Sequence, residues 1–272
     1  QPTKILSAFK EFMRLQPVGT LNFRKLFLML ISAFALAEFR SYFSQLSCFR
    51  AAKMAFIGYD FLFPIPCSLA LAKLSIKTVA YQERSNLLCL PNYQAACFDY
   101  YFVWGDFFKR CLENLKSIAI KNFIVLGPPR LSLLKLKLQQ KEAIKQAVFS
   151  KFGLSKAYDR VVVCYDYHAE NFEVQLKNPS VNWENNKVFY RDIIALATEY
   201  PNLLFIIRGK DDAWYHLDAF KELRSIMDHM VNIVIDHEYT ILGRSYDLAA
   251  LADLVIAKYT SIGDECLAAG IP

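Results

Sequence analysis

Glycine is scarce in this sequence, and the few glycines are scattered. The nine glycines among 272 residues form neither the G-x-G-x-x-G turn of a dinucleotide site nor the G-x-x-x-x-G-K-[ST] loop that cradles phosphates. The sequence also lacks H-E-x-x-H and D-x-D patterns, and its four histidines do not have the spacing of metal ligands. We therefore expect no protein-held metal and no cofactor.

Paired cysteines and long apolar runs are missing as well. Seven dispersed cysteines without a C-x-x-C pair are typical neither of a zinc knuckle nor of a disulfide framework, and they favour a reduced, cytoplasmic chain. The longest apolar run, residues 26–37, has about half of the ~20 residues that a bilayer span requires. Arg24, Lys25, Glu38 and Arg40 border this run, which we interpret as a buried or interfacial helix.

Charge is divided unevenly within the net +6. Residues 1–150 hold 20 Lys and Arg against 8 Asp and Glu, whereas residues 151–272 hold 12 against 18. The basic half favours an anionic partner, and the mixture of basic and phenylalanine residues near the start suits an anionic membrane surface. The alternative is that these lysines are unevenly distributed but simply solvated, with no particular partner. Nucleic acid is not expected, because the basic residues are diffuse and no nucleic-acid-binding module is recognisable.

The pattern from residue 53 onward alternates short apolar runs with helical stretches, which is typical of parallel α/β sheets. We expect two Rossmann-like, doubly wound domains that face a cleft. The predicted domains are an incomplete, basic acceptor-side domain at 1–130, a linker helix at 131–158 and an incomplete nucleotide-donor domain at 159–272. Because the chain starts without Met and stops directly after a predicted helix, we expect further elements beyond both ends.

The segment ADLVIAKYTSIGDECLAAGIP, residues 252–272, carries the clearest candidate site. A buried strand at 253–257 is followed by a hydroxyl-rich turn and a helix at 263–269, and ligands of open α/β sheets bind beyond the carboxyl ends of the strands. Thr260 and Ser261 can donate to phosphate oxygens, and Glu265 can accept two hydrogen bonds from a ribose diol. Ordinary helix capping and a first-turn carboxylate are the structural alternative.

This segment resembles the donor-binding end of GT-B glycosyltransferases, in the branch that joins capsule and lipopolysaccharide sugar transferases to CDP-glycerol glycerophosphotransferases. Other segments resemble the family in the same order: FDYYFVWGDFFKRCL at 98–112, VLGPPR at 125–130, VVVCYDYH at 161–168 and LLFIIRGK at 203–210. The resemblance implies that a nucleotide-activated donor is bound, without a metal, by these residues: Arg208, Lys210, Thr260, Ser261 and Glu265.

One segment departs from that family. Where glycerophosphotransferases carry a His-Gly pair, this chain reads YQERSN at 81–86. The missing histidine favours sugar transfer over glycerophosphate transfer, with a carboxylate as the base. Glu83, after the predicted strand at 77–81, is the first candidate, and Asp60, after the strand at 54–58, is the second. An ion pair with Arg84 is the structural alternative for Glu83.

Asp166 and His168 end the first strand of the second half, where they can contact the donor or the acceptor. A capping aspartate and a structural histidine are the alternatives for this pair.

The sequence thus predicts an inverting, metal-independent transferase that moves a sugar from a nucleotide donor to a glycan or lipid-linked acceptor in cell-surface polysaccharide synthesis. We expect it in the cytoplasm, peripheral to the inner membrane face. Three alternatives stay open: glycerol-phosphate transfer, a nucleotide-sugar 2-epimerase of the same fold, and a non-enzymatic scaffold. The identities of the sugar, the nucleotide and the acceptor are not encoded in any pattern that we can interpret.

Overall fold

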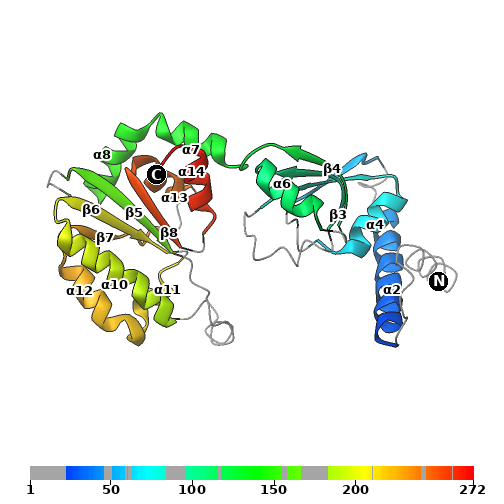
Figure 1. The fold of residues 1–272 in the computed structure, drawn as a ribbon, viewed down its shortest axis with the longest axis horizontal. Helices are drawn as coiled ribbons and strands as arrows, with labels where there is room; N and C mark the ends of the chain where they lie inside the picture. The colour runs from blue at the N-terminus through cyan, green and yellow to red at the C-terminus, as the bar shows by residue number, and fades with distance from the viewer. Residues whose placement is uncertain are drawn as a thin grey trace. The chain divides into compact units, whose positions relative to one another are not determined.

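The computed structural model describes residues 23–45, 51–58, 60, 63–83, 96–115, 118–154, 158–166, 183–209, 211–239, 243–258 and 260–272. The chain divides into two compact units, Gln1–Pro129 and Arg130–Pro272, and each unit contains its own four-stranded sheet (Figure 1). The division falls next to residue 130, where the sequence predicts the end of the first domain.

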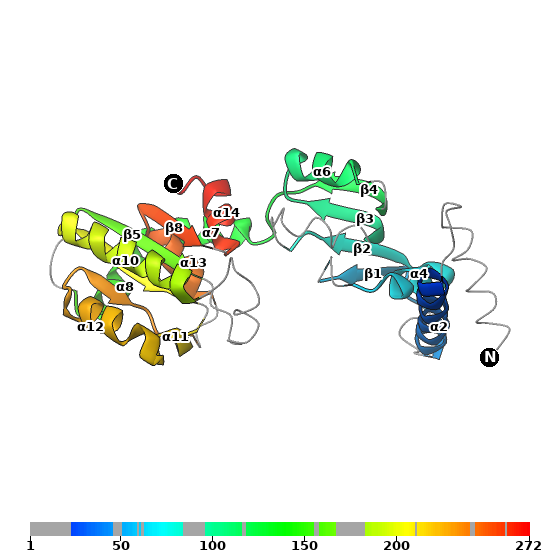
Figure 2. The ribbon, with the colours of Figure 1, turned by 60° about the horizontal axis from the view of Figure 1, so that its bottom comes forward.

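The first unit holds a parallel sheet in the order β1-β2-β3-β4. Its strands are β1 (Met54–Ile57), β2 (Lys77–Tyr81), β3 (Cys97–Val103) and β4 (Ala119–Val125). Its helices are α2 (Phe23–Gln45), α4 (Ile65–Lys73) and α6 (Asp106–Glu113). Tyr101, Val103 and Leu112 are fully buried between the sheet and α6, and α4 contacts both the sheet and α2 (Figure 2).

The second unit holds a parallel sheet in the order β7-β6-β5-β8. Its strands are β5 (Arg160–Asp166), β6 (Leu203–Arg208), β7 (Ile233–Ile235) and β8 (Leu254–Lys258). Its helices are α7 (Leu131–Leu138), α8 (Lys141–Lys151), α10 (Trp183–Glu199), α11 (Ala213–His216), the 3-10 turn η2 (Asp218–Phe220), α12 (Lys221–His229), α13 (Arg244–Leu251) and α14 (Ile262–Ala268).

Both faces of the second sheet are covered, as the apolar run of β5 predicts. Val161 and Val163 pack with α7, α8, α13 and α14, whereas Val162 and Cys164 pack with α10, α11 and α12. Successive residues of a strand point to opposite faces, so one uninterrupted run of apolar residues serves two cores. The unit is therefore a doubly wound, Rossmann-like domain.

The segment predicted as a linker helix, 131–158, differs from that expectation. It contains two helices, α7 and α8, rather than one. Leu134 and Val148 from these helices are almost fully buried in the core of the second unit. Most of the described Lys and Gln residues of this segment are exposed or half-buried, and the burial of Leu134 and Val148 joins it to the domain.

The strand order of the second sheet creates a reversal beside β5. The chain proceeds from β5 to β6 and β7 on one side and returns to β8 on the other. Ligands of open parallel sheets bind at such a reversal, beyond the carboxyl ends of the strands. The ends of β5, β6 and β8 are consequently the place to look for a site.

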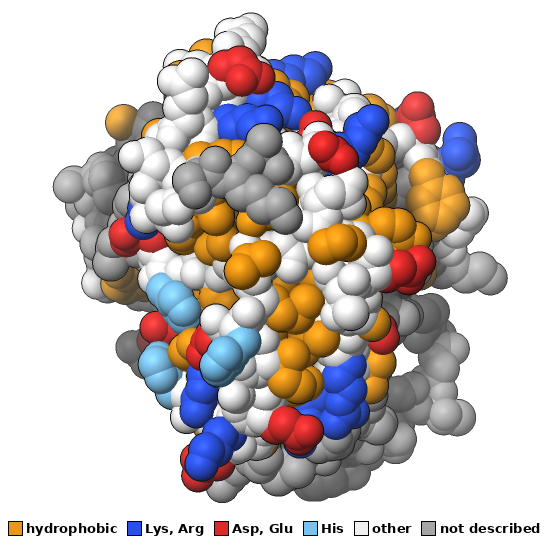
Figure 3. All heavy atoms as spheres, turned by 90° about the vertical axis from the view of Figure 1, so that its left-hand side faces the viewer, with side chains coloured by type: hydrophobic (Ala, Val, Ile, Leu, Met, Phe, Trp, Pro, Cys, Tyr) orange, Lys and Arg blue, Asp and Glu red, His pale blue; other side chains and the backbone are white. Residues whose placement is uncertain are grey.

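The surface of the second unit shown in Figure 3 mixes both signs of charge. Lys and Arg lie among Asp and Glu there, with apolar side chains between them. The acidic excess of the second half is thus dispersed over the described side chains of that face, as expected for a solvated surface.

Candidate functional site

A pocket of about 310 Å³ opens at the carboxyl ends of β5, β6 and β8. It is lined by Arg130, Tyr165, Asp166, Arg208, Gly209, Ser245, Tyr246, Thr260, Ser261, Ile262 and Glu265. Five residues that the sequence analysis selected are therefore brought together in one pocket of the second unit. Lys210 and His168, which were selected with them, lie outside the described residues.

Glu265 is the buried carboxylate of this pocket. It lies in the first turn of α14 and is only 2% exposed. Its carboxylate accepts a hydrogen bond from the Tyr246 hydroxyl, with 2.6 Å between the oxygens. Burial raises the pKa of Glu265, while the hydrogen bond from Tyr246 and the positive charge of Arg130 oppose that rise.

Arg208 brings a buried cation to the end of β6. Its Nε donates to the Ser245 hydroxyl at 2.9 Å, and its Nη1 donates to the Glu238 carbonyl at 2.9 Å and to the carboxylate of Asp236. Asp236 is fully buried and also accepts from Nη2 of Arg244 at 3.1 Å. The two guanidinium groups and the one carboxylate of this cluster have a net charge of +1, and Arg208 brings part of that charge to the lining, which also contains the carboxylates of Asp166 and Glu265. A guanidinium group at this place suits an anionic group of a ligand.

Thr260 and Ser261 supply hydroxyl groups between β8 and α14. Ser261 occupies the N-cap position of α14, but within the described part of the chain its side chain makes no capping hydrogen bond. Ordinary capping therefore does not account for this hydroxyl. Both residues are half-buried and line the pocket, where their hydroxyls can donate to ligand oxygens.

Asp166 and Lys258 end two paired strands beside the pocket. They are partners in the register of β5 and β8, and Asp166 is 3% exposed and hydrogen-bonds the Tyr190 phenol. Burial lowers the pKa of Lys258, while the nearby charge of Asp166 counteracts that effect. The carboxylate of Asp166 is thus held at the edge of the pocket by neighbours within the domain.

Three residues of this region were missed by the sequence analysis. Arg130 closes the motif VLGPPR, yet no role followed from its position in the sequence. Lys258 belongs to the very segment that carried the resemblance. Tyr246 had no signal, because its contact with Glu265 spans 19 positions of sequence and depends on how α13 packs beside α14.

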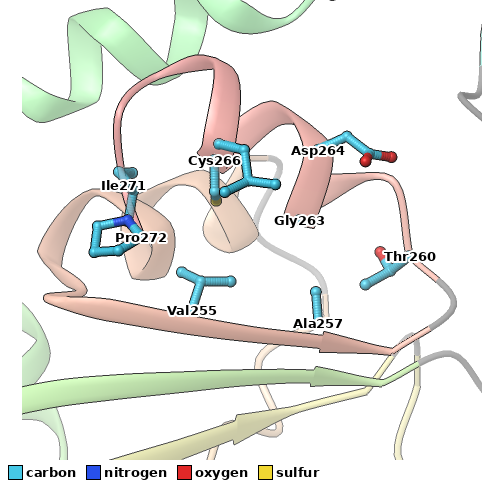
Figure 4. A pocket seen from close by; sticks show the side chains of 9 residues that line it. Val255, Ala257, Thr260, Gly263, Asp264, Cys266, Ile271 and Pro272 are labelled. Atoms are coloured by element: carbon cyan, nitrogen blue, oxygen red, sulfur yellow. The ribbon is translucent and has the colours of Figure 1, made fainter.

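A second pocket, of about 270 Å³, lies between β8 and α14 (Figure 4). In this view Gly263 of the helix stands above Ala257 of the strand. A Cβ added at Gly263 would come within 2.6 Å of the Ala257 Cβ. The glycine therefore permits the close approach of helix and strand that places Ser261 and Glu265 beside the end of β8.

The two base candidates of the first unit are neighbours. Asp60, which is 1% exposed, accepts a hydrogen bond from the Tyr101 hydroxyl at 2.5 Å and one from the Glu83 amide at 3.4 Å. The Oε2 atom of Glu83 is buried without a hydrogen-bond partner among the described residues. Since β1, β2 and β3 end here, the two carboxylates occupy the edge of the first sheet at which α/β proteins place their sites.

Comparison with known proteins identifies the fold. No protein-family model matches the chain, and no curated protein matches it, so the resemblance to polysaccharide transferases has no support from sequence families. Among solved structures, UDP-GlcNAc 2-epimerase from Neisseria meningitidis bound to UDP-GlcNAc matches with a TM-score of 0.55 and 16% identity, over 98% of this chain and 70% of that one.

Two further structures match similarly. S. aureus MnaA in a structure with UDP gives a TM-score of 0.52 and 12% identity, over 98% of this chain and 67% of that one. UDP-GlcNAc 2-epimerase from Methanocaldococcus jannaschii gives 0.52 and 14%, over 99% and 78%. These likenesses confirm the predicted fold class, namely α/β with two Rossmann-like domains of the GT-B-like type.

Proposed function

We propose that the protein is an enzyme that acts on a nucleoside-diphosphate sugar bound in the pocket of its second unit. One observation carries the proposal: the buried Glu265 carboxylate shares a pocket with the cationic side chains of Arg130 and Arg208. A carboxylate suits a ribose diol, and guanidinium groups suit a diphosphate. The pocket therefore offers complementary groups to both parts of one ligand.

The size of the pocket limits how much of the ligand it encloses. About 310 Å³ lies at the lower end of the range of roughly 300–1,000 Å³ for small-molecule sites. In our proposal the pocket encloses the ribose and diphosphate, with Glu265 on the ribose and the hydroxyls of Thr260 and Ser261 on the phosphates. The sugar extends beyond it.

Epimerisation at C2 of the sugar is the reaction we propose. Its support is the likeness in fold to two structures described as UDP-GlcNAc 2-epimerases, one of them bound to UDP-GlcNAc, and to S. aureus MnaA in a structure with UDP. C2 of the sugar is not adjacent to a carbonyl, so when its hydrogen leaves as a proton, the electron pair must form a C1–C2 double bond while the nucleoside diphosphate leaves C1. Return of a proton to the opposite face of C2 and of the diphosphate to C1 completes the epimerisation, which therefore needs acid and base groups. Asp60 and Glu83 are the carboxylates we propose for these roles.

Glycosyl transfer is the second candidate, supported by the resemblance of residues 252–272 to the donor-binding end of sugar transferases. In that reaction the same carboxylates would take the proton of an acceptor hydroxyl. Arg208 would stabilise the charge of the departing diphosphate.

Product analysis separates the two reactions. Incubation with UDP-GlcNAc in deuterium oxide, followed by chromatography and NMR, should yield the C2 epimer with deuterium at C2 and without net release of UDP. Release of UDP only when a glycan or lipid-linked acceptor is present would show that the reaction is glycosyl transfer and that epimerisation is wrong. If UDP-GlcNAc, other nucleotide sugars and CDP-glycerol all stay unchanged with and without acceptors, an enzymatic function is wrong.

Calorimetry with UDP tests the pocket independently of turnover. Glu265→Ala should weaken UDP binding by about 1.5–3 kcal/mol, the usual contribution of a hydrogen bond to a charged group. The matched control is Asp264→Ala, which removes the neighbouring, exposed carboxylate on the same helix, where it lines the other pocket. If the folded Glu265→Ala variant binds UDP as tightly as the wild type, Glu265 does not contact the nucleotide and the assignment is wrong.

A further inference from the structure

The first half of α2 exposes an unusual number of large apolar side chains. Five of them are between 45% and 53% exposed, and they are Phe27, Leu28, Leu30, Ile31 and Phe34. Residues 26–37 contain no charged residue. A helix that is apolar on its outer side as well as on its packed side is expected in contact with an apolar environment.

The other side of α2 is attached to the first unit. Met29, Ala33 and Leu36 are buried, and Ala33 and Leu36 pack with Ala70 of α4 in one apolar cluster. Phe39 and Phe43 extend this packing along the helix. The packed residues recur every three or four positions, so the five exposed residues lie on the side of α2 that faces away from α4.

The sequence around the helix is electrostatically suited to an anionic surface. Residues 1–25 contain five Lys and Arg and a single acidic residue, Glu11. Basic residues directly before an apolar helix are attracted to anionic headgroups, while the apolar side chains enter the headgroup and acyl boundary. The charge and the exposed apolar face therefore fit the same partner.

We propose that α2 docks the protein on an anionic lipid bilayer, with the helix lying along the membrane surface. By length and composition Leu26–Gln45 is also long enough to cross a membrane. However, α2 packs on α4 from Ala33 to Phe43, and a crossing helix would take α4 into the hydrocarbon region with it. A helix lying at the interface keeps these contacts and buries the exposed apolar side chains in lipid.

Vesicle sedimentation tests this proposal. The wild-type chain should sediment with vesicles of phosphatidylcholine containing phosphatidylglycerol, and much less with phosphatidylcholine alone. The variant Ile31→Glu/Phe34→Glu should lose at least tenfold in partitioning, because it places two charges on the lipid-facing side. The control is Phe107→Glu, which adds a charge in place of a phenylalanine that is 61% exposed on α6 and should bind like the wild type.

Folding and oligomeric state are measured on the same samples. Thermal unfolding shows whether the double variant is folded. If it is not, Phe34→Ser takes its place, because this variant removes apolar area without adding a charge. Phe34→Ser should also lower partitioning. Equal sedimentation of wild type and the folded variants would overturn the proposal, as would equal binding to neutral and anionic vesicles. It would also be overturned if the chain bound no vesicle and formed a dimer that the variants dissociate.

Discussion

Tyr246 donates its hydroxyl hydrogen to the carboxylate of Glu265 across 2.6 Å, and so joins the first turn of α13 to the first turn of α14. The Tyr246 hydrogen bond and the positive charge of Arg130 both favour the ionised form of Glu265. Burial has the opposite effect and raises the pKa of Glu265. Keeping the ionised form that a ribose diol requires therefore lowers the stability of the folded state.

Replacement of Glu265 by Gln should therefore change how stability depends on pH. Because the pKa of Glu265 is raised in the folded state, that state binds more protons than the unfolded chain between the ordinary pKa of 4.5 and the raised value. The wild type should lose stability as pH rises through this window. Glu265→Gln does not titrate and can still accept from Tyr246, so its melting temperature relative to wild type should increase with pH. Thermal unfolding at pH values from 4 to 8 measures this, and a constant difference would contradict it.

The parallel sheets and part of the site could be predicted from the sequence, for identifiable reasons. Strand β5 reads as an unbroken apolar run because both of its faces are buried, and the rule for ligands at strand ends selects Thr260, Ser261 and Glu265. The contact of Arg208 with Asp236 could not be predicted, since the pairing of charges distant in sequence depends on loop geometry. The packing of α7 and α8 on the second core was not predicted either. Their many lysines indicated a solvated linker, although Leu134 and Val148 are buried.

Gly263→Ala should destabilise the second unit. The added methyl group would lie 2.6 Å from the Cβ of Ala257, so α14 would have to move away from β8. Overpacking of this kind typically costs about 1–3 kcal/mol, and the shift would also displace Glu265 and lower nucleotide affinity. Gly58→Ala is the matched control, because a Cβ there meets no atom within 4 Å. Equal urea midpoints for the two variants would show that α14 adjusts without loss.

Asp236→Ala should destabilise the second unit more strongly. The carboxylate of Asp236 is fully buried between Arg208 and Arg244, and its removal would leave two buried cations without their counter-charge. Breaking a buried ion pair on one side typically costs about 3–5 kcal/mol. The exposed residue Asp192 of α10 provides the control, and Asp192→Ala should change the free energy of unfolding by less than about 0.5 kcal/mol. A loss below 1 kcal/mol for Asp236→Ala would mean that water replaces the carboxylate.

The last prediction concerns the division of labour between Asp60 and Glu83. Asp60 already accepts hydrogen bonds from the Tyr101 hydroxyl and the Glu83 amide, whereas Oε2 of Glu83 has no partner among the described residues. We therefore predict that Glu83 moves the proton and that Asp60 positions the backbone that carries it.

Glu83→Gln keeps the shape of the side chain and removes its basicity, so turnover should fall roughly 10²–10⁴-fold, the usual contribution of general acid–base catalysis. The affinity for UDP, measured by calorimetry, should stay within about a factor of two, and the melting temperature should be unchanged. Asp60→Asn should lower the melting temperature, because a buried acceptor of two hydrogen bonds is altered. If a stable Asp60→Asn variant loses all turnover while Glu83→Gln stays active, Asp60 moves the proton and Glu83 does not. If both variants stay active, neither carboxylate takes part in the chemistry.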